Sequence, residues 1–373
     1  MISGQGTQHL GSNLGQQMIQ ELHRHLMIDE QWTEWHEDGF TWWSAYLAQR
    51  FRSQGPRDID GTPTWWLSYE MALLKGVEDG MPAHLTVMYL NRMSNLTAFY
   101  LTGGRLVARG RVYALPESAP DRIRLLADRA IIANVDASSR AMGLVTVMQQ
   151  MSEAAGGHSA STLPDFSAHP VSGPRPQMDD MLNVVDRLFR PWGSDPLPRG
   201  DRPDLDAAAN ALLVMGFSVD GGNATGDVVA ALGGDSADLL IIMDLNTRHP
   251  LLGHGLLTRL QLDSKLSEAA GSAPLTPEAL ARILNDEEWT ASQPLLHCGA
   301  WTPTLHGEAG RGTITYASFL PNLGLAPGTG TVVAIDAARR GVWARQQLEQ
   351  LALPGMTDAA QEHGRERDGG LRT

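Results

Sequence analysis

The spacing of apolar residues along the chain changes several times between a helical period and a strand period. A leader over 1–13, rich in Gly, Gln and Ser, precedes the first periodic segment. Leu14, Met18, Leu22 and Leu26 then recur at near-helical spacing. This pattern predicts that the first ordered element is a helix beginning close to residue 14.

Two strands that contain paired tryptophans are predicted next, over 39–52 and 62–75. The segment between them, "SQGPRDIDGTP", holds two Gly and two Pro and is typical of a hairpin connection. Gly103-Gly104 between two apolar runs indicates a second hairpin. Further helices are predicted over 82–94, 118–151, 178–190, 206–215, 276–290 and 329–351, and further strands over 96–102, 105–113, 216–220, 238–246, 254–263, 295–304 and 311–320.

The predicted elements follow a similar order in the two halves of the chain. Each half has strands, then a helix with a Leu-Asn pair (Leu90-Asn91 and Leu284-Asn285), then two more strands and a long helix. Such a repeat indicates a duplication. Helices segregated around small antiparallel sheets are typical of the α+β class, so we expect two modules, each an antiparallel sheet packed with helices.

Module boundaries follow from breaks in the periodic pattern. With 373 residues the chain is long for a single hydrophobic core. The segment 152–177 is rich in Gly, Ser, Ala, His and Pro, shows no period and is interpreted as a linker. We therefore expect a flexible leader over 1–13, modules over 14–151 and 178–353, and a disordered tail over 354–373.

Composition limits which kinds of partner the protein is expected to bind and which cell compartment it is expected to occupy. The net charge of −13 argues against nucleic acid as the main partner, because phosphate binding requires clustered positive charge. No stretch approaches 18 continuous apolar residues and no secretory signal is present, so we expect no membrane span. A single cysteine, Cys298, excludes an internal disulfide and fits a reducing cytoplasm. We expect a cytoplasmic protein without a cofactor.

Six of the ten tryptophans lie between residues 32 and 66. Within "GFTWWSAYLAQRF", a period of two places Phe40, Trp42 and Tyr46 on one face of the predicted strand and Trp43 and Phe51 on the other. Both faces are apolar, which leaves two interpretations open. Either helices cover the strand on both sides, or one face forms a groove for a client, meaning a segment of another protein, in which Trp and Tyr serve as anchors.

Two longer segments resemble a known family. "FTWWSAYLAQRF", followed by "LNRMSNLTAFYLTGGRLVARGRVY" and a long helix, resembles the N-terminal module of bacterial YbjN-like proteins related to type III secretion chaperones. "LLGHGLLTRLQL", "ILNDEEW", "GTITYASFLPN" and "ARRGVWARQQL" resemble its C-terminal companion. The similarity covers about 14–151 and 178–351. It implies helices packed on an antiparallel sheet that holds a peptide or protein segment, and either a homodimer or an intramolecular pairing of the two modules.

Candidates for catalysis and metal binding are weak. "GHSAS" (157–161) lacks the final Gly and the strand–turn–helix context of a nucleophile elbow. His297 and Cys298 are adjacent on a predicted strand and therefore point to opposite faces. His249 and His254 do not have the spacing of a closed metal site. We therefore expect no enzyme, no catalytic residue and no metal.

The sequence thus predicts a non-catalytic, chaperone-like protein that binds a client protein or peptide through an apolar, tryptophan-lined surface. The predicted strand that Pro321 ends leads either into a turn capped by Asn322 or to the polar rim of that surface. Arg339 and Arg340 form either solvated ion pairs or a site for a client carboxylate. The alternatives are a structural subunit of a bacterial defence or secretion complex and, less favoured, a hydrolase. The predicted client-binding residues are Trp42, Trp43, Tyr46, Trp65, Trp66, Tyr316, Phe319, Asn322 and Arg340.

Overall fold

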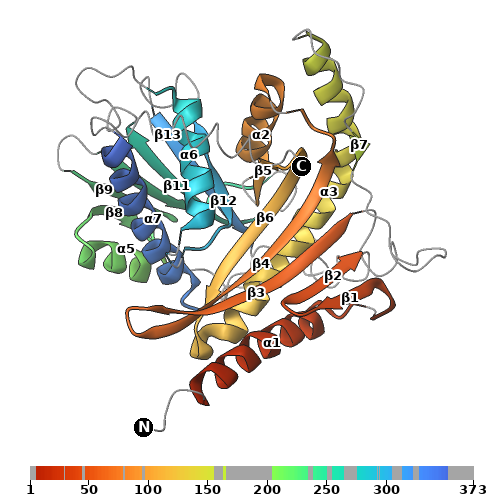
Figure 1. Cartoon of the computed structure of the whole chain (residues 1–373). Coiled ribbons are helices and arrows are strands. Elements are labelled where there is room, and N and C mark those ends of the chain that lie inside the picture. Colours follow the sequence, from red (N-terminus) through yellow and green to blue (C-terminus); the bar gives the residue numbers. More distant parts are fainter. Residues whose placement is uncertain are drawn as a thin grey trace.

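The structure, a computed structural model of the chain, has two modules that each contain an antiparallel sheet with helices packed on it (Figure 1). This arrangement confirms the predicted α+β class. The residues that the structure describes are 6–28, 30–43, 47–78, 80–94, 97–154, 163–164, 204–233, 238–249, 254–263, 275–291, 293, 295–304, 313–321 and 327–351.

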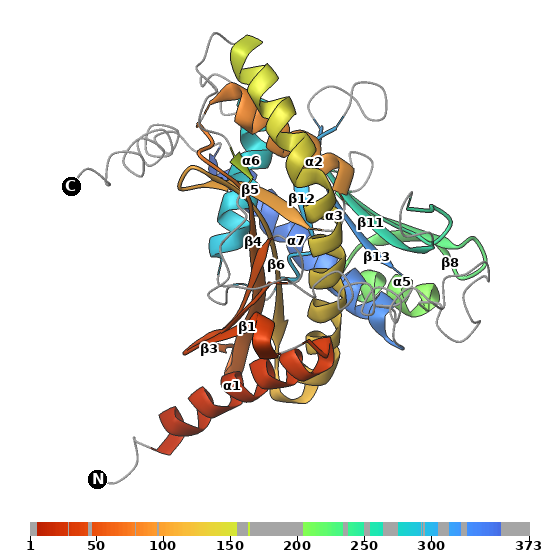
Figure 2. The same cartoon turned by 90° about the vertical axis from the view of Figure 1, so that its right-hand side faces the viewer.

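The N-terminal module is built around a seven-stranded sheet. Its elements are α1 (Gly6–Leu26), η1 (Glu30–Trp32), β1 (Thr33–His36), β2 (Gly39–Trp43), β3 (Ala48–Ile59), β4 (Thr62–Lys75), α2 (Met81–Ser94), β5 (Ala98–Thr102), β6 (Arg105–Ala114), η2 (Pro116–Ser118), α3 (Ala119–Ala154) and β7 (Leu163–Pro164). The strand order is β1-β2-β3-β4-β6-β5, and β7 pairs with β4 beside this path. Helices α1 and α3 pack against the same face of the sheet and against each other (Figure 2).

The C-terminal module contains a six-stranded sheet. Its elements are α5 (Leu205–Val214), β8 (Ser218–Gly222), β9 (Asp227–Leu232), β10 (Leu239–Asp244), β11 (Gly255–Asp263), α6 (Pro277–Thr290), β12 (Gly299–Pro303), β13 (Thr313–Pro321) and α7 (Thr329–Leu351). The strand order is β12-β13-β11-β10-β9-β8. Helix α7 packs on β10 and β11, and α5 packs on α7.

The two modules have the same topology. In each, a helix precedes four strands, a middle helix, two further strands and a long helix, and the last strand pairs beside the fourth. The Leu-Asn pairs occupy matching places in the two modules. Asn91 of α2 bonds to both backbone groups of Phe99 in β5, and Asn285 of α6 bonds to both backbone groups of Trp301 in β12. The shared topology and the shared asparagine contact support the predicted duplication.

The segment "GFTWWSAYLAQRF" forms two strands, and the prediction of one strand over 39–52 is wrong. Strand β2 pairs antiparallel with β3, so Phe40 lies opposite Phe51 and Trp42 lies opposite Gln49. The rings of Phe40 and Phe51 stack with centroids 4.7 Å apart. The two phenylalanines therefore share a face, whereas an uninterrupted strand would separate them.

The connection after Phe51 is also shorter than predicted. Strands β3 and β4 continue pairing to Ile59 and Thr62, with a shift of register between Gln54 and Arg57. The turn itself is Asp60-Gly61, where both residues have positive φ. Asp-Gly is the favoured sequence for such a two-residue turn, so the signal was present in the sequence. The predicted Gly103-Gly104 hairpin is confirmed between β5 and β6.

Most other predicted elements agree with the structure, with three differences. Helix α1 begins at Gly6, inside the predicted leader, and α3 continues to Ala154, past the predicted start of the linker. Strands β1, β7 and β9 were not predicted, and β7 lies within the predicted linker. The predicted helix over 178–190 lies outside the described residues.

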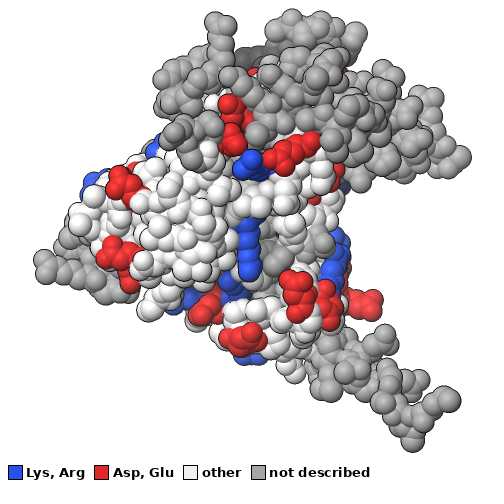
Figure 3. All heavy atoms as spheres, turned by 90° about the vertical axis from the view of Figure 1, so that its left-hand side faces the viewer, with Lys and Arg blue, Asp and Glu red and all other residues white. Residues whose placement is uncertain are grey.

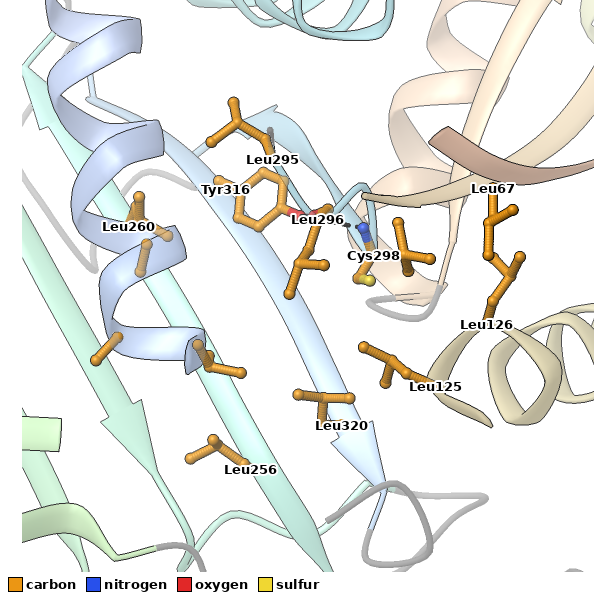
Figure 4. Close-up of a cluster of buried hydrophobic side chains, with 14 of the residues drawn as sticks. Leu67, Leu125, Leu126, Leu256, Leu260, Leu295, Leu296, Cys298, Tyr316 and Leu320 are labelled. Carbon is orange, nitrogen blue, oxygen red and sulfur yellow. Dashed lines mark hydrogen bonds between the residues drawn. The ribbon is translucent and has the colours of Figure 1, made fainter. Parts of the chain in front are cut away.

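One buried hydrophobic cluster extends through both modules. In Figure 4, Leu125 of α3 lies next to Leu320 of the C-terminal module, while Leu126 lies beside Leu67 of the N-terminal sheet; all belong to this cluster. The Cys298 thiol is buried, and burial raises its pKa. The two modules are therefore packed together through apolar side chains.

Polar contacts add to this junction. Arg129 of α3 donates from Nη1 to the carbonyl of Cys298 at 2.7 Å and from Nη2 to the carbonyl of Phe319 at 3.0 Å. Arg111 of β6 and His297 exchange two backbone hydrogen bonds of 3.1 and 2.8 Å. Because these bonds are buried or backbone-mediated, they fix how the two sheets meet.

Among the described residues, no helix is both long enough and apolar enough to cross a membrane.

Candidate functional site

The four tryptophans of the predicted client surface are buried. Trp42, Trp43, Trp65 and Trp66 are between 2% and 5% exposed, and Trp42 and Trp65 belong to the shared hydrophobic cluster. Of the two interpretations left open by the sequence, the strand covered on both sides agrees with this burial. A client could contact Trp42, Trp43 and Trp65 only after their packing opens, whereas Trp66 also lines the groove described below; the assignment stays a prediction.

The remaining predicted client residues divide into buried and undescribed positions. Tyr316, Phe319 and Arg340 are 1–2% exposed. Tyr46 and Asn322 lie outside the described residues. The seven predicted residues that the structure describes are therefore buried and do not form one exposed surface.

Arg340 belongs to a buried ion network instead of a surface patch. Its Nε donates to Glu288 at 2.9 Å, its Nη1 donates to Asp336, and its Nη2 donates to the carbonyl of Leu296. Burial lowers the pKa of Arg340, but the two carboxylates outweigh this effect and hold the pKa well above its ordinary value. Because groups of the protein itself occupy the guanidinium, Arg340 could bind a client carboxylate only by giving up one of these contacts, and its assignment as a client-binding residue stays a prediction.

His297 connects this network to the N-terminal module. Burial, together with Arg111 and Arg340, holds the pKa of His297 well below its ordinary value, so the ring is neutral. The Nε2 atom lies 2.6 Å from Arg111 Nη2 and accepts its hydrogen bond, while Nδ1 lies 3.5 Å from Glu288 Oε1. A neutral ring with its proton on Nδ1 satisfies both neighbours.

These ionisable groups do not form an accessible catalytic site. A hydrolase requires groups of altered pKa that converge in a cavity open to substrate. Glu288 and His297 are each 2% exposed and line neither of the two cavities described below. Among the described residues, no group of three or more His, Cys, Asp or Glu side chains could hold a metal ion. The "GHSAS" segment lies outside the described residues.

An open groove lies between the β3–β4 hairpin of the N-terminal module and α7 of the C-terminal module. Its volume is about 790 Å³. Both modules contribute side chains, which are Arg57, Asp58, Ile59, Asp60, Thr62, Thr64, Trp66, Tyr113 and Leu115 from the first and Met215, Gln293, Leu295, Arg339, Val342, Trp343 and Gln346 from the second. Figure 3 shows the side of the molecule that includes α7, where basic side chains lie in a central recess with acidic side chains above and below it.

The groove combines an aromatic floor with a charged rim. Trp66 and Trp343 are buried, and the Nε1 atom of Trp66 has no hydrogen-bond partner in the protein. The Arg57 guanidinium lies 5.1 Å from the centroid of the Trp66 ring. Arg339 and Met215 are exposed at the rim. The groove therefore offers apolar surface and a cation to whatever enters it.

Sequence reasoning found part of this groove and missed the rest. Trp66 was predicted as a client residue, and Arg339 was identified as part of a basic patch. Arg57, Met215 and Trp343 were not predicted. Residue type was the only sign of these three residues in the sequence. It does not distinguish a binding residue, because arginines in hairpins and tryptophans in helices also occur away from binding sites.

The chain matches no protein-family model, no curated protein and no solved structure. The function is therefore argued from the geometry of the protein itself.

Proposed function

We propose that the protein is a non-catalytic, chaperone-like protein of the cytoplasm that binds a segment of a client protein in the groove between its two modules. The observation that carries this proposal is the 790 Å³ groove, which both modules line and which has two tryptophans in its floor. Grooves that combine buried aromatic anchors with a polar rim are typical of peptide recognition. The proposal moves the client site from the faces of the tryptophan strands to the junction.

The lining residues define the chemistry of the client. An apolar side chain of the client would contact the parts of Trp66 and Trp343 that line the groove. An acidic side chain would pair with the exposed Arg339. Next to the groove, the end of α5 exposes Leu213 by 51% and Val214 by 89%, which extends the apolar surface beyond Met215.

Exposed rim residues give the sharpest test, because they change binding without disturbing the core. Arg339→Glu and Met215→Asp are compared with Arg282→Glu, an exposed arginine of α6 outside the groove. Partners are purified from the native host with the wild-type protein, and their binding to each purified variant is measured by calorimetry. We expect Arg339→Glu to weaken binding at least tenfold, since it replaces a charge-assisted hydrogen bond by repulsion.

The control separates the groove from general charge effects. Arg282→Glu changes the net charge by the same amount and is expected to bind like the wild type. A partner that binds both rim variants with unchanged affinity would show that the groove is not the client site. Circular dichroism of each variant establishes that it is folded.

A second function, a permanent subunit of a larger assembly, is favoured by a different surface. Leu85, Tyr89 and Met93 follow one another at helical spacing on α2 and are 42%, 60% and 50% exposed. A continuous apolar stripe on a helix is typical of an interface. Tyr89→Asp would release a permanent partner bound there and leave a client of the groove in place, so the same purification distinguishes the two functions.

A further inference from the structure

The N-terminal sheet carries a group of arginines on the face opposite α1 and α3. Pairing places Arg50 of β3, Glu70 of β4 and Arg109 of β6 side by side in one row. Two residues further along the strands, Arg52, Ser68 and Arg111 form a second row. Residues two apart on a strand share a face, and directly paired residues have Cβ atoms about 5 Å apart. The register therefore brings four guanidinium groups together.

These side chains enclose a cavity distinct from the groove. Its volume is about 210 Å³, and it shares no lining residue with the groove. Trp289 of α6 forms a wall contributed by the C-terminal module. The lining residues are Arg50, Arg52, Gln54, Ser68, Glu70, Arg109, Arg111 and Trp289.

Positive charge exceeds negative charge in this cavity. Glu70 is the only acidic residue among the described residues that line the cavity, and it accepts a hydrogen bond from Arg109 Nε at 2.7 Å. Outside the lining, Asp38 lies 3.2 Å from Arg50 Nη2 and 3.6 Å from Arg52 Nε, and the buried Glu288 carboxylate acts on Arg111. Within the lining, four arginines face one carboxylate, and Asp38 and Glu288 lie beside it, which leaves an excess of positive charge in a protein whose net charge is −13. Clustered like charges repel each other unless an anion joins them.

Three arginine donors in the cavity also lack acceptors. The Nε atoms of Arg50, Arg52 and Arg111 are buried and have no hydrogen-bond partner in the protein. Arg111 is itself only 8% exposed. A buried N–H group without an acceptor is costly, so natural structures seldom keep one without a reason. These Nε atoms are shielded from solvent, and Arg52 Nε lies 3.6 Å from Asp38, so what the cavity offers a ligand is the positive charge of the guanidinium groups.

Two of the four arginines, Arg109 and Arg111, are held in place before any ligand arrives, whereas the side chains of Arg50 and Arg52 are 40% and 34% exposed. Arg111 donates from Nη1 to the carbonyl of Trp289 at 2.9 Å and from Nη2 to the carbonyl of Glu288 at 3.2 Å. The guanidinium carbons of Arg109 and Arg111 lie 5.1 and 5.3 Å from the centroid of the Trp289 ring. Fixed cations lose little conformational freedom when an anion binds. The C-terminal module therefore completes the cavity by fixing two of its arginines.

We propose that this cavity binds a phosphate group. The excess of arginines suits a phosphate, which carries up to two negative charges and offers more acceptor oxygens to several guanidinium groups than a carboxylate does. A volume of about 210 Å³ admits a phosphate together with a small organic group. The site does not depend on the client groove, because neither lining residues nor ligand chemistry are shared.

The test measures thermal stability and calorimetric affinity with inorganic phosphate, using sodium chloride of equal ionic strength and succinate as references. Phosphate is expected to raise the melting temperature of the wild-type protein, and both references are expected to leave it unchanged. Arg52→Gln is expected to weaken phosphate binding at least tenfold, because a charge and a donor are lost together. Arg92→Gln, an exposed arginine of α2, is the matched control and is expected to bind like the wild type.

Glu70→Gln provides a readout that a purely structural role of the cavity would not produce. It removes the one carboxylate among the described lining residues, so repulsion of the anion falls and phosphate affinity is expected to rise several-fold. An equal response to chloride, equal binding of succinate, or unchanged binding in Arg52→Gln would each overturn the proposal. Two further probes, glycerol phosphate and a phosphoserine peptide, identify the source of the phosphate. Tighter binding of the first assigns the site to a small molecule, and tighter binding of the second assigns it to a phosphorylated protein.

Discussion

At the residue scale, one buried carboxyl couples the stability of the fold to pH. Asp128 of α3 is 5% exposed, and burial raises its pKa to about 7, although Arg124 acts in the opposite direction. In the unfolded chain the carboxyl has an ordinary pKa of about 3.9. The folded state therefore binds the proton more tightly than the unfolded state, and stability falls as the pH rises from about 4 to about 7.

Asp128→Asn is expected to remove this dependence and to stabilise the protein at pH 8. Raising the pKa of a carboxyl from 3.8 to about 7 corresponds to about 4 kcal/mol, which is an upper limit because the site relaxes. The free energy of unfolding of both proteins is measured by urea denaturation at pH 5 and pH 8. If the two proteins lose stability equally between these values, the carboxyl is not protonated in the folded state.

At the element scale, Asn91 and Asn285 each form hydrogen bonds with the backbone on the unpaired side of an edge strand. Strands β5 and β12 are the last strands of their sheets, so one side of each has no neighbouring strand in the sheet. Asn285 Nδ2 donates to the carbonyl of Trp301 at 2.9 Å, and the Trp301 amide donates to Asn285 Oδ1 at 2.8 Å. The side chain therefore acts as a short neighbouring strand and attaches the middle helix to the sheet edge.

Asn285→Ala is expected to destabilise the protein by roughly 2–4 kcal/mol, because two buried backbone groups lose their partners. Asn91→Ala removes the matching contacts with Phe99 in the N-terminal module and is expected to have an effect of similar size. Denaturation by urea measures both effects, and Asn246→Ala in an exposed loop is the control. A loss below about 0.5 kcal/mol, the scatter expected for surface changes, would contradict the role of the contact.

At the scale of the whole molecule, the junction between the modules positions both proposed sites. The groove has walls from both modules, and the arginine cavity is completed by Trp289. Arg129 links α3 to two carbonyls of the C-terminal module, at Cys298 and Phe319. Loss of these bonds should loosen the contact between sheets while leaving each sheet paired.

Arg129→Met retains the apolar stem and removes the two hydrogen bonds. We expect faster amide hydrogen exchange in β6, β12 and β13, which meet at the junction, and unchanged exchange in β9 and β10, which lie away from it. Phosphate and client binding should weaken together if both sites depend on the junction. Uniformly faster exchange in all strands would instead indicate a global loss of stability.

The sequence predicted many elements closely because helical and strand periods are local properties. Helices over 276–290 and 329–351 agree with α6 and α7 within one residue at each end. The Leu-Asn pairs identified the repeat, because both halves need the same contact at a sheet edge. The division of 39–52 into two strands was missed because both strands are rich in apolar residues and the segment between them lacks Gly and Pro.

The sequence by itself thus determined the fold class, the two modules and most of their elements. Only the tertiary structure decided which side chains are accessible. Trp42 and Trp66 are buried by distant elements, Arg340 is paired with Glu288, and the groove and the arginine cavity are each formed by residues from both modules. The physical reason is that burial and charge pairing depend on strand register and on packing between segments far apart in the chain, which a local period of two or 3.6 residues does not encode.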